Sequence, residues 1–289
     1  MKKKIALIDG NALCHVVKHA TKELSFNGSS TGVLFGLIRK LFNIQEKIFA
    51  NQYLFCWDDS EVLERKMIYP QYKCNRSAQK EEEKKLNSIA IPQFNIARLF
   101  MLPSIGWKNH FIYPGIESDD IIAKLIEQHK ADYDFIIISR DNDFYQLLDG
   151  EAVIMFDPVK FSYTTERSFK EKSQISKDKW AFVKAISGCS GDGVAGVSGI
   201  GSATAIKFLK NELNKKSKKF QDIVNNEETI INNLRLVMLP WETTPEFEFI
   251  NDELSKEMFI KICMEYGFKS YLAEGLQDKF KDLFIDAQE

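Results

Sequence analysis

Three short apolar segments constrain the fold of this 289-residue chain more than any other feature, because an aspartate follows each one. Apolar runs of this length are typical of strands buried on both faces of a parallel sheet. Helical patterns at residues 32–49 and 121–129 separate them, and residues 153–156 could form a further strand. This alternation predicts an α/β fold with a mostly parallel central sheet flanked by helices. The segments are residues 5–8, 53–57 and 135–138, followed by Asp9, Asp58 and Asp141.

The chain changes character at about residue 165, where the strand signal fades. Helical spacing follows at 177–186, and another helix is expected from about Ser202. Near the C-terminus, Asn251 or Asp252 could cap a helix that runs to Tyr266 and stops at Gly267. We therefore expect an α/β core at 1–165 and a helical region at 166–289.

The composition excludes several classes of protein. A hydrophobic content of 44% and a charged content of 28% are those of an ordinary globular protein, and no stretch is long and apolar enough for a membrane span. Five scattered cysteines without metal-ligand spacing argue against a disulfide framework and a structural zinc site. We expect a cytosolic protein. With a net charge of −2, any surface for a polyanion must be local, and residues 207–219, with six lysines and one glutamate, are one candidate.

The three strand-end aspartates should meet at one edge of the sheet, where open α/β folds bind their ligands. Asp143 should point to the same side as Asp141 if the chain there is extended. Glu117, Asp119 and Asp120 come just before the helical pattern at 121–129, where acidic residues also favour a helix start. Any one of these residues alone is more often a cap, but together they would repel one another without a cation.

The residue types indicate which cation. Carboxylates without histidine suit Mg²⁺ or Mn²⁺ rather than zinc. Two such ions about 3.5–4 Å apart are typical of phosphodiester chemistry, in which they activate water and stabilise the leaving oxygen. The basic stretch RKMIYPQYKCNR, with Arg65, Lys73 and Arg76, follows Asp58 and could share the charge of a phosphate. By itself it would be an exposed basic loop.

Residues 188–201 read GCSGDGVAGVSGIG and contain six of the 15 glycines. The stretch includes a G-x-G-x-x-G match, but a helical pattern rather than a strand precedes it, which argues against a dinucleotide site. A glycine-rich turn between helices can instead present backbone N–H groups to phosphate oxygens. The regular placement of Val194, Val197 and Ile200 argues against a flexible linker.

Together these segments resemble the 5′ nuclease family of 5′–3′ exonucleases and flap endonucleases, especially its compact bacterial and bacteriophage members. The resemblance covers about residues 1–210. It rests on five motifs in family order: IALIDGNAL, FCWDD…R…PQYKCNR, GIESDD, SRDNDFYQL and GDGVAGVSGIGSATA.

The resemblance implies a PIN-like nuclease core with two metal ions. The first ion would be held by Asp9, Asp58, Glu117 and Asp119, with Asp120 in the same cluster, and the second by Asp141, Asp143 and Asp192. Asp141 would also be catalytic, and Lys73 and Arg76 would engage the scissile phosphate. The family commonly has an aspartate where this chain has Cys189. Because a thiol is a poor Mg²⁺ ligand, we expect a weakened second site.

The resemblance also implies how DNA is held. The insertion at about 75–105 would be a helical arch for a single-stranded 5′ end, and residues 180–210 a helix–three-turn–helix motif that grips duplex DNA, often with K⁺. The predicted DNA contacts are Arg65, Tyr72, Lys73, Arg76, Gly196, Gly199, Gly201, Ser202 and Lys207.

We therefore expect a monomeric, structure-selective 5′ nuclease that acts on DNA with a free or flapped 5′ end and leaves a 5′-phosphate. An RNA–DNA hybrid is a further candidate substrate. Two alternatives stay open, a non-catalytic branched-DNA-binding protein of the same fold and an RNase of the PIN type.

Overall fold

A six-stranded sheet forms the centre of the computed structural model, which describes residues 2–21, 23–59, 63–74, 81–273 and 275–288. The strand order is β5-β4-β1-β6-β7-β8, parallel from β5 to β7, with β8 antiparallel to β7. The sheet thus has the predicted, mostly parallel topology. Its strands are β5 (His110–Phe111), β4 (Gln52–Cys56), β1 (Lys3–Asp9), β6 (Tyr133–Ile138), β7 (Val153–Asp157) and β8 (Ser162–Thr164).

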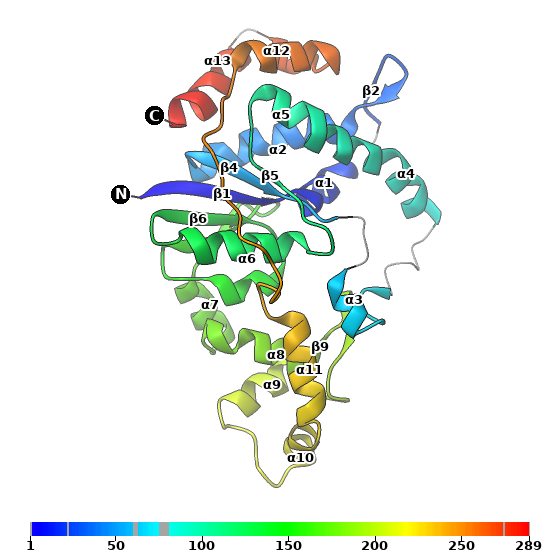
Figure 1. Ribbon diagram of the computed structural model, residues 1–289, viewed down its shortest axis with the longest axis vertical. Helices are drawn as coiled ribbons and strands as arrows, with labels where there is room; N and C mark the ends of the chain where they lie inside the picture. The colour runs from blue at the N-terminus through cyan, green and yellow to red at the C-terminus, as the bar shows by residue number, and fades with distance from the viewer. Residues whose placement is uncertain (1, 22, 60–62, 75–80, 274, 289) are drawn as a thin grey trace.

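Helices cover both faces of this sheet and extend beyond it at either end (Figure 1). The α-helices are α1 (Gly10–Lys18), α2 (Gly32–Ile48), α3 (Glu64–Ile68), α4 (Glu81–Ile96), α5 (Leu102–Ile105), α6 (Ser118–His129), α7 (Glu166–Ser173), α8 (Trp180–Ser187), α9 (Ser202–Leu209), α10 (Lys218–Asn225), α11 (Glu227–Val237), α12 (Lys256–Glu265) and α13 (Leu276–Phe280). Two short hairpins are β2 (Ser25–Phe26) with β3 (Ser29–Ser30), and β9 (Gly188–Cys189) with β10 (Val194–Ala195).

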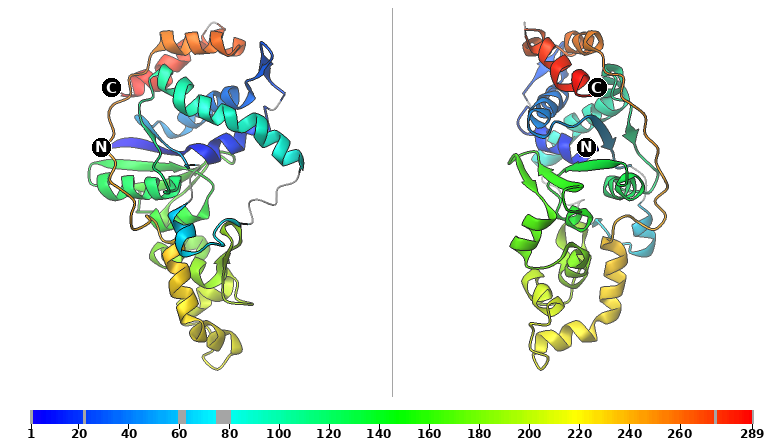
Figure 2. Two further views of the ribbon diagram at one scale, coloured as in Figure 1. Left: turned by 45° about the vertical axis from the view of Figure 1, so that its right-hand side comes forward. Right: turned by 90° about the vertical axis from the view of Figure 1, so that its left-hand side faces the viewer.

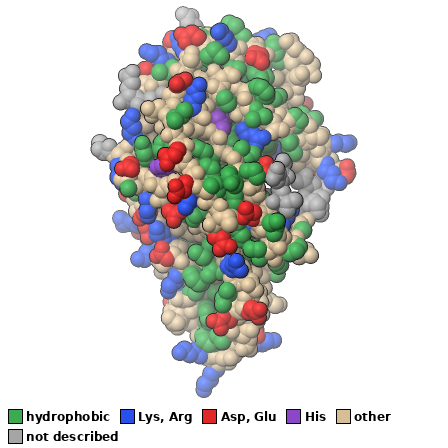
Figure 3. Space-filling view, viewed as in Figure 1, with side chains coloured by type: hydrophobic (Ala, Val, Ile, Leu, Met, Phe, Trp, Pro, Cys, Tyr) green, Lys and Arg blue, Asp and Glu red, His purple; other side chains and the backbone are tan. Residues whose placement is uncertain are grey.

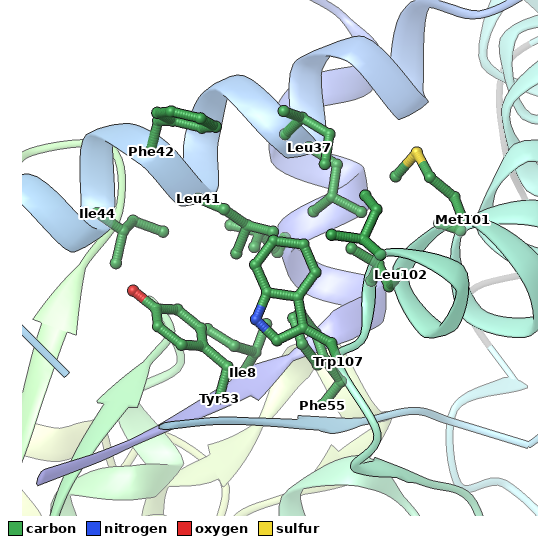
Figure 4. Close-up of a cluster of buried hydrophobic side chains, with 14 of the residues drawn as sticks. Ile8, Leu37, Leu41, Phe42, Ile44, Tyr53, Phe55, Met101, Leu102 and Trp107 are labelled. Atoms are coloured by element: carbon green, nitrogen blue, oxygen red, sulfur yellow. The ribbon is translucent and has the colours of Figure 1, made fainter. Parts of the chain in front are cut away.

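Alternating side chains of the strands build two hydrophobic cores, one on each face of the sheet. Ala6 and Ile8 of β1 face α1, α2 and α5, whereas Ile5 and Leu7 face α6 and α8. This is the period of two that a strand imposes. Figure 4 shows the first core, in which Trp107 lies among side chains of β4, α2 and α5. Both faces are apolar, which explains why the strands read as continuous apolar runs.

The C-terminal third divides between the two ends of the molecule (Figure 2). Helices α8 to α11 form the narrow end, whereas α12 and α13 return to pack on α2 at the other. Phe280 stacks on Phe259 at a centroid distance of 4.3 Å, and both rings contact Phe42 of α2. The helical region expected at 166–289 therefore contributes to the core of the α/β region as well.

Two local predictions were wrong. Helix α12 begins at Lys256 with Ser255 as its cap, because the Asp252 carboxylate instead accepts hydrogen bonds from Lys108 N (2.8 Å) and Asn109 Nδ2 (3.0 Å). The chain is not extended from Asp141 to Asp143, because Asp141 caps a 3₁₀ helix, η3 (Asn142–Leu147). None of the described helices has the length and hydrophobicity to cross a membrane.

Candidate metal and nucleic-acid site

Asp9, Asp58 and Asp141 lie at the carboxyl ends of three adjacent strands, as predicted from the sequence. A hydrogen bond holds each one: Asp9 accepts from Ala12 N (3.0 Å), Asp58 from Ser118 N (2.9 Å) and Asp141 from Asp143 N (2.9 Å). Burial raises the pKa of Asp9 to about 7, and the nearby charges of Asp58 and Asp141 add to the rise. These carboxylates therefore repel one another in one small region, as a site for a cation requires.

A second acidic group stands at the start of α6, where Glu117, Asp119 and Asp120 have carboxylate oxygens within 4.8 Å of one another. Burial raises the pKa of Asp119 well above its usual range, and Asp120 and Glu117 contribute to the rise. The Asp58–Ser118 hydrogen bond ties this helix start to the end of β4. The α6 group thus belongs to the same sheet edge.

A third group combines Asp143 and Asp192 with the sulfur of Cys189, again with ligand atoms within 4.8 Å of one another. Burial raises the pKa of Cys189 to about 11, so its thiol is neutral near pH 7. Lys184 of α8 forms an ion pair with Asp143. This group therefore differs from the other two in holding a neutral thiol.

Lys73 connects the second and third groups. Its ammonium pairs with Glu117 and lies 3.7 Å from an oxygen of Asp192. Its backbone N–H donates to the Asp192 carbonyl (2.7 Å), and its φ of 56° is in the left-handed region, where a non-glycine residue is strained. Lys73 also lowers the pKa of Asp9, which places it near all three groups. The predicted ligands from five separate segments thus converge.

We divide the site into two halves: the first contains Asp9, Asp58, Glu117 and Asp119, and the second contains Asp141, Asp143, Asp192 and Cys189. The donor set of the first half suits a hard divalent cation. Asp9, Asp58, Glu117 and Asp119 offer only carboxylate oxygens, the donors that such a cation prefers. The pKa of Asp9 is raised to about 7, first by burial and then by the charge of Asp58. In the second half, the Cys189 sulfur replaces one oxygen donor. The residues fit one Mg²⁺-like ion well and a second ion less well.

Two residues predicted to contact DNA are buried in the structure. Arg65 is 3% exposed and Tyr72 is 4% exposed, so neither side chain reaches the surface. The Tyr72 hydroxyl donates to Glu117 (2.8 Å). Arg65 is surrounded by acceptors of the protein, among them Asp120 (2.8 Å). Both side chains contact the acidic residues, and their roles in DNA binding stay predictions. Arg76 falls outside the described residues, and its role stays a prediction.

Other predicted residues lie where a duplex could reach them. Gly199, Gly201 and Ser202 are exposed around the start of α9, and Lys207 is exposed in its last turn. A Cβ at Gly199 or Gly201 would meet no heavy atom within 4 Å. Gly196 instead packs closely, because a Cβ there would lie 2.2 Å from Ser187 C. Val194, Val197 and Ile200 are buried, so this segment is a packed turn and not a linker.

Basic side chains gather at the narrow end of the molecule, near α10 (Figure 3). Lys215, Lys216, Lys218 and Lys219 are all exposed there. They belong to the lysine-rich run predicted as a local polyanion surface. Such a patch would add affinity without sequence preference.

Two features of the site were not predicted from the sequence. Lys184 was not singled out, although it is the one charged side chain in the apolar segment WAFVKAIS and stands five residues before Cys189. A pocket of about 280 Å³ beside Asp58 was also missed, because it forms between α1 and α4. His15, Trp57 and Phe94 line it, and burial lowers the pKa of His15 to about 4, so that ring is neutral.

Comparison with known proteins agrees with this geometry. Residues 4–174 match the model of the 5′-3′ exonuclease N-terminal resolvase-like domain. The 5′-3′ exonuclease of Buchnera aphidicola (subspecies Schizaphis graminum) is 30% identical over 232 residues, which are 79% of this chain and 76% of that protein. That of Bacillus subtilis is 27% identical over 215 residues, covering 72% and 70%. DNA polymerase I of Caldicellulosiruptor bescii is 29% identical over 72% of this chain, but the match spans only 24% of the polymerase.

Solved structures share the fold. The bacteriophage T5 5′-exonuclease with bound zinc superposes with a TM-score of 0.71 at 21% identity, covering 99% of this chain and all of the other. Flap endonuclease-1 from Methanococcus jannaschii gives a TM-score of 0.59 at 16% identity, covering 99% and 93%. With the matched domain spanning more than half of its length, the chain belongs to the 5′–3′ exonuclease family.

Proposed function

We propose that this protein is a divalent-metal-dependent, structure-selective 5′ nuclease that hydrolyses DNA phosphodiesters at 5′ ends or flaps and leaves a 5′-phosphate. One observation carries the proposal. Carboxylates from the ends of β1, β4 and β6 lie close enough to raise the pKa of Asp9, beside the start of α6, where the Lys73 ammonium pairs with Glu117 and lies near Asp192. This arrangement suits phosphoryl chemistry, because it can balance a phosphate between cations and an ammonium.

Each residue then has a defined task. Asp9, Asp58, Glu117 and Asp119 would hold a divalent cation, Mg²⁺ or Mn²⁺, and Asp141, Asp143 and Asp192 would face a second. Bound ions of this kind activate water and stabilise the leaving oxygen. Lys73, 12% exposed and already among carboxylates, would turn its ammonium to the scissile phosphate when DNA binds. Arg76 would assist it. Asp120 would support the first site, since Arg65 and Trp241 N occupy its oxygens.

The DNA path would run from the sheet edge to the narrow end of the molecule. The exposed turn at Gly199 and Gly201 and the side chains of Ser202 and Lys207 would contact the duplex backbone, with K⁺ at the turn. The pocket beside Asp58, with its aromatic wall, would accept part of the 5′ strand, which the arch at 75–105 would guide. Contacts of this kind read the shape and charge of the duplex rather than its sequence. An RNA–DNA hybrid would fit the same surface.

The relatives support these proposals. One T5 flap endonuclease structure is described as a complex with DNA and metal ions, and the catalytic core of Rad2 as a complex with a DNA substrate. The bacterial exonuclease relatives agree with a cytoplasmic place of action. We further propose that the chain acts as a monomer, with the α/β core at 1–165 carrying the chemistry and residues 180–210 gripping the duplex.

Cleavage of a 5′-labelled flap substrate tests the function. Purified protein with Mg²⁺ or Mn²⁺ should release the labelled flap, EDTA should stop the release, and single-stranded DNA without a duplex should be cut far more slowly. Asp141→Asn should lose turnover and still bind the substrate in a gel-shift assay. Normal cleavage by Asp141→Asn would remove the site assignment.

A non-catalytic DNA-binding protein is the second candidate, favoured by the thiol and ammonium in the second half of the site. The same assay separates the two, because such a protein would bind the flap substrate and release no label with either metal. A PIN-type RNase would cleave single-stranded RNA instead, and it explains neither Lys73 among the carboxylates nor the packed glycine turn.

A further inference from the structure

Arg65 of α3 is a fully enclosed arginine beside the acidic site. Its side chain is 3% exposed, and all five of its N–H groups face acceptors of the protein. One guanidinium edge donates to both oxygens of Asp120, with Nη2 to Oδ1 at 2.8 Å, and Nη1 also donates to Glu117 (3.1 Å). No donor is left for a substrate.

The remaining donors of Arg65 reach a distant part of the chain. Nε donates to the Leu236 carbonyl (3.0 Å) and Nη2 to the Met238 carbonyl (3.5 Å), at the C-terminal end of α11. Helix α11 packs on α8 through the Asn233 side chain, which donates to the Ala185 carbonyl (2.9 Å). Arg65 therefore joins the start of α6 to the helices that carry the glycine turn.

Trp241 also helps to hold the guanidinium in place. Its carbon lies 4.9 Å from the ring centroid of Trp241, whose backbone N–H donates to Asp120 Oδ1 (2.7 Å). The Trp241 indole donates to Glu64 (2.9 Å), the residue before Arg65. Fixed from three sides, the fork of Arg65 can impose one orientation on Glu117 and Asp120.

We infer that Arg65 is a positioning residue that orients Glu117 for cation binding and locks the start of α6 to the end of α11. This inference rests on the proposed function in one respect only, the assignment of Glu117 to the metal site. Outer partners of this kind commonly change metal affinity or activity by about 10–100-fold when altered.

The geometry requires arginine rather than any cation. A lysine at position 65 would keep the charge but has no planar fork, so it could not contact Asp120 through two nitrogens and reach Glu117 and the α11 carbonyls at once. Arg65→Lys therefore separates positioning from charge. If Arg65 acted only through its charge, Arg65→Lys would leave the cation affinity unchanged.

Mn²⁺ titration of the DNA-free protein, by calorimetry or by electron paramagnetic resonance of free Mn²⁺, is the direct test. Arg65→Lys should weaken the tighter Mn²⁺ site about 10–100-fold with an unchanged circular dichroism spectrum. Arg235→Lys is the matched control, because Arg235 of α11 is 52% exposed in its side chain, and its Mn²⁺ affinity should stay at the wild-type value.

A double-mutant cycle distinguishes positioning from general damage. In a Glu117→Gln background, Arg65→Lys should change Mn²⁺ affinity by less than about twofold, since the group that it orients has lost its charge. Should Arg65→Lys fold poorly, Trp241→Leu removes the stacking ring without changing any charge and should weaken Mn²⁺ binding in the same direction. A lower Tm with wild-type Mn²⁺ affinity in the folded variants would overturn the inference.

Failure of the inference differs from failure of the proposed function. A wild-type protein that binds Mn²⁺ but cuts no flap substrate would refute the nuclease and leave the Arg65 result standing. A wild-type nuclease with an insensitive Arg65→Lys variant would refute the positioning role alone.

Discussion

The two halves of the acidic site are built from different chemistry. In the first half, Asp9, Asp58 and Asp119 offer carboxylate oxygens, and the cations Arg65 and Lys73 contact Glu117 at its border. In the second half, Lys184 pairs with Asp143, and Cys189 contributes a neutral sulfur. Both halves contain cations of the protein, but the first offers only carboxylate oxygens to a metal ion, whereas the second has a neutral sulfur in place of one oxygen donor. Cation affinity should therefore be strongly unequal between the halves.

The largest effect is expected from the first half. Asp9→Asn removes the carboxylate at the end of β1, so cleavage of the flap substrate should fall about 10³-fold or more, the scale on which loss of a key charge-stabilising group slows an enzyme. The measurement is the rate constant of single-turnover cleavage in Mg²⁺. DNA affinity in EDTA should change little. If Asp9→Asn retains a tenth of the activity, the halves do not differ in the way described.

A buried carboxylate outside the site is the reference for a purely structural role. Asp252 accepts from Lys108 N, Asn109 Nδ2 and Tyr53 N, and burial raises its pKa to about 6. Asp252→Ala should lower the free energy of unfolding by about 2–4 kcal/mol, because it leaves buried donors without an acceptor. Urea denaturation measures this loss. Mn²⁺ affinity of the folded variant should match wild type, and a large change would link Asp252 to the site.

Cys189→Asp should make the cation affinity of the second half more like that of the first. Restoring a carboxylate opposite Lys184 should lower the Mg²⁺ concentration for half-maximal cleavage about tenfold, because an ionised oxygen replaces a neutral sulfur. Cys189→Ser is the control, since it removes the thiol without adding charge. An equal or higher Mg²⁺ requirement in Cys189→Asp would mean that the thiol does not weaken this half.

The smallest effect is a pH dependence of metal stabilisation. Asp9 has a pKa of about 7 in the folded, metal-free protein, whereas an unfolded aspartate ionises near pH 4. The folded state therefore binds this proton more tightly than the unfolded state does. The stability that the proton contributes is lost as pH rises from about 4 to 7. A divalent ion replaces the proton, so Mn²⁺ should raise Tm more at pH 8 than at pH 6. Thermal unfolding of wild type and Asp9→Asn measures this, and equal shifts at both pH values would contradict it.

Much of the fold could be predicted from the sequence, because the central strands carry unmistakable apolar runs and Gly267 and Ser202 mark helix ends. Strands β5 and β8 could not, since they are two and three residues long and take their conformation from their neighbours. The prediction that Asp252 could cap a helix was wrong for a similar reason. A distant segment, Lys108 and Asn109, competes for the same carboxylate, and no local pattern reveals that competition.

The site was predictable where motif and strand end coincide, as at Asp9 and Asp58. It was not predictable where a basic residue turns inward. Arg65 and Tyr72 stand in a basic, polar stretch that predicts exposure, yet the acidic groups that they contact come from residues 117 and 120. Lys184 was missed for the same reason, because its partner Asp143 lies on another element. Burial of a charge depends on partners far away in the chain.

The most direct test of the whole account is the number and affinity of Mn²⁺ ions that the DNA-free protein binds, followed by electron paramagnetic resonance. Carboxylates that converge on a cation predict one tight and one weaker site in wild type, with loss of the tight site in Asp9→Asn. Absence of saturable binding in wild type, or an identical isotherm for Asp9→Asn, would contradict the account.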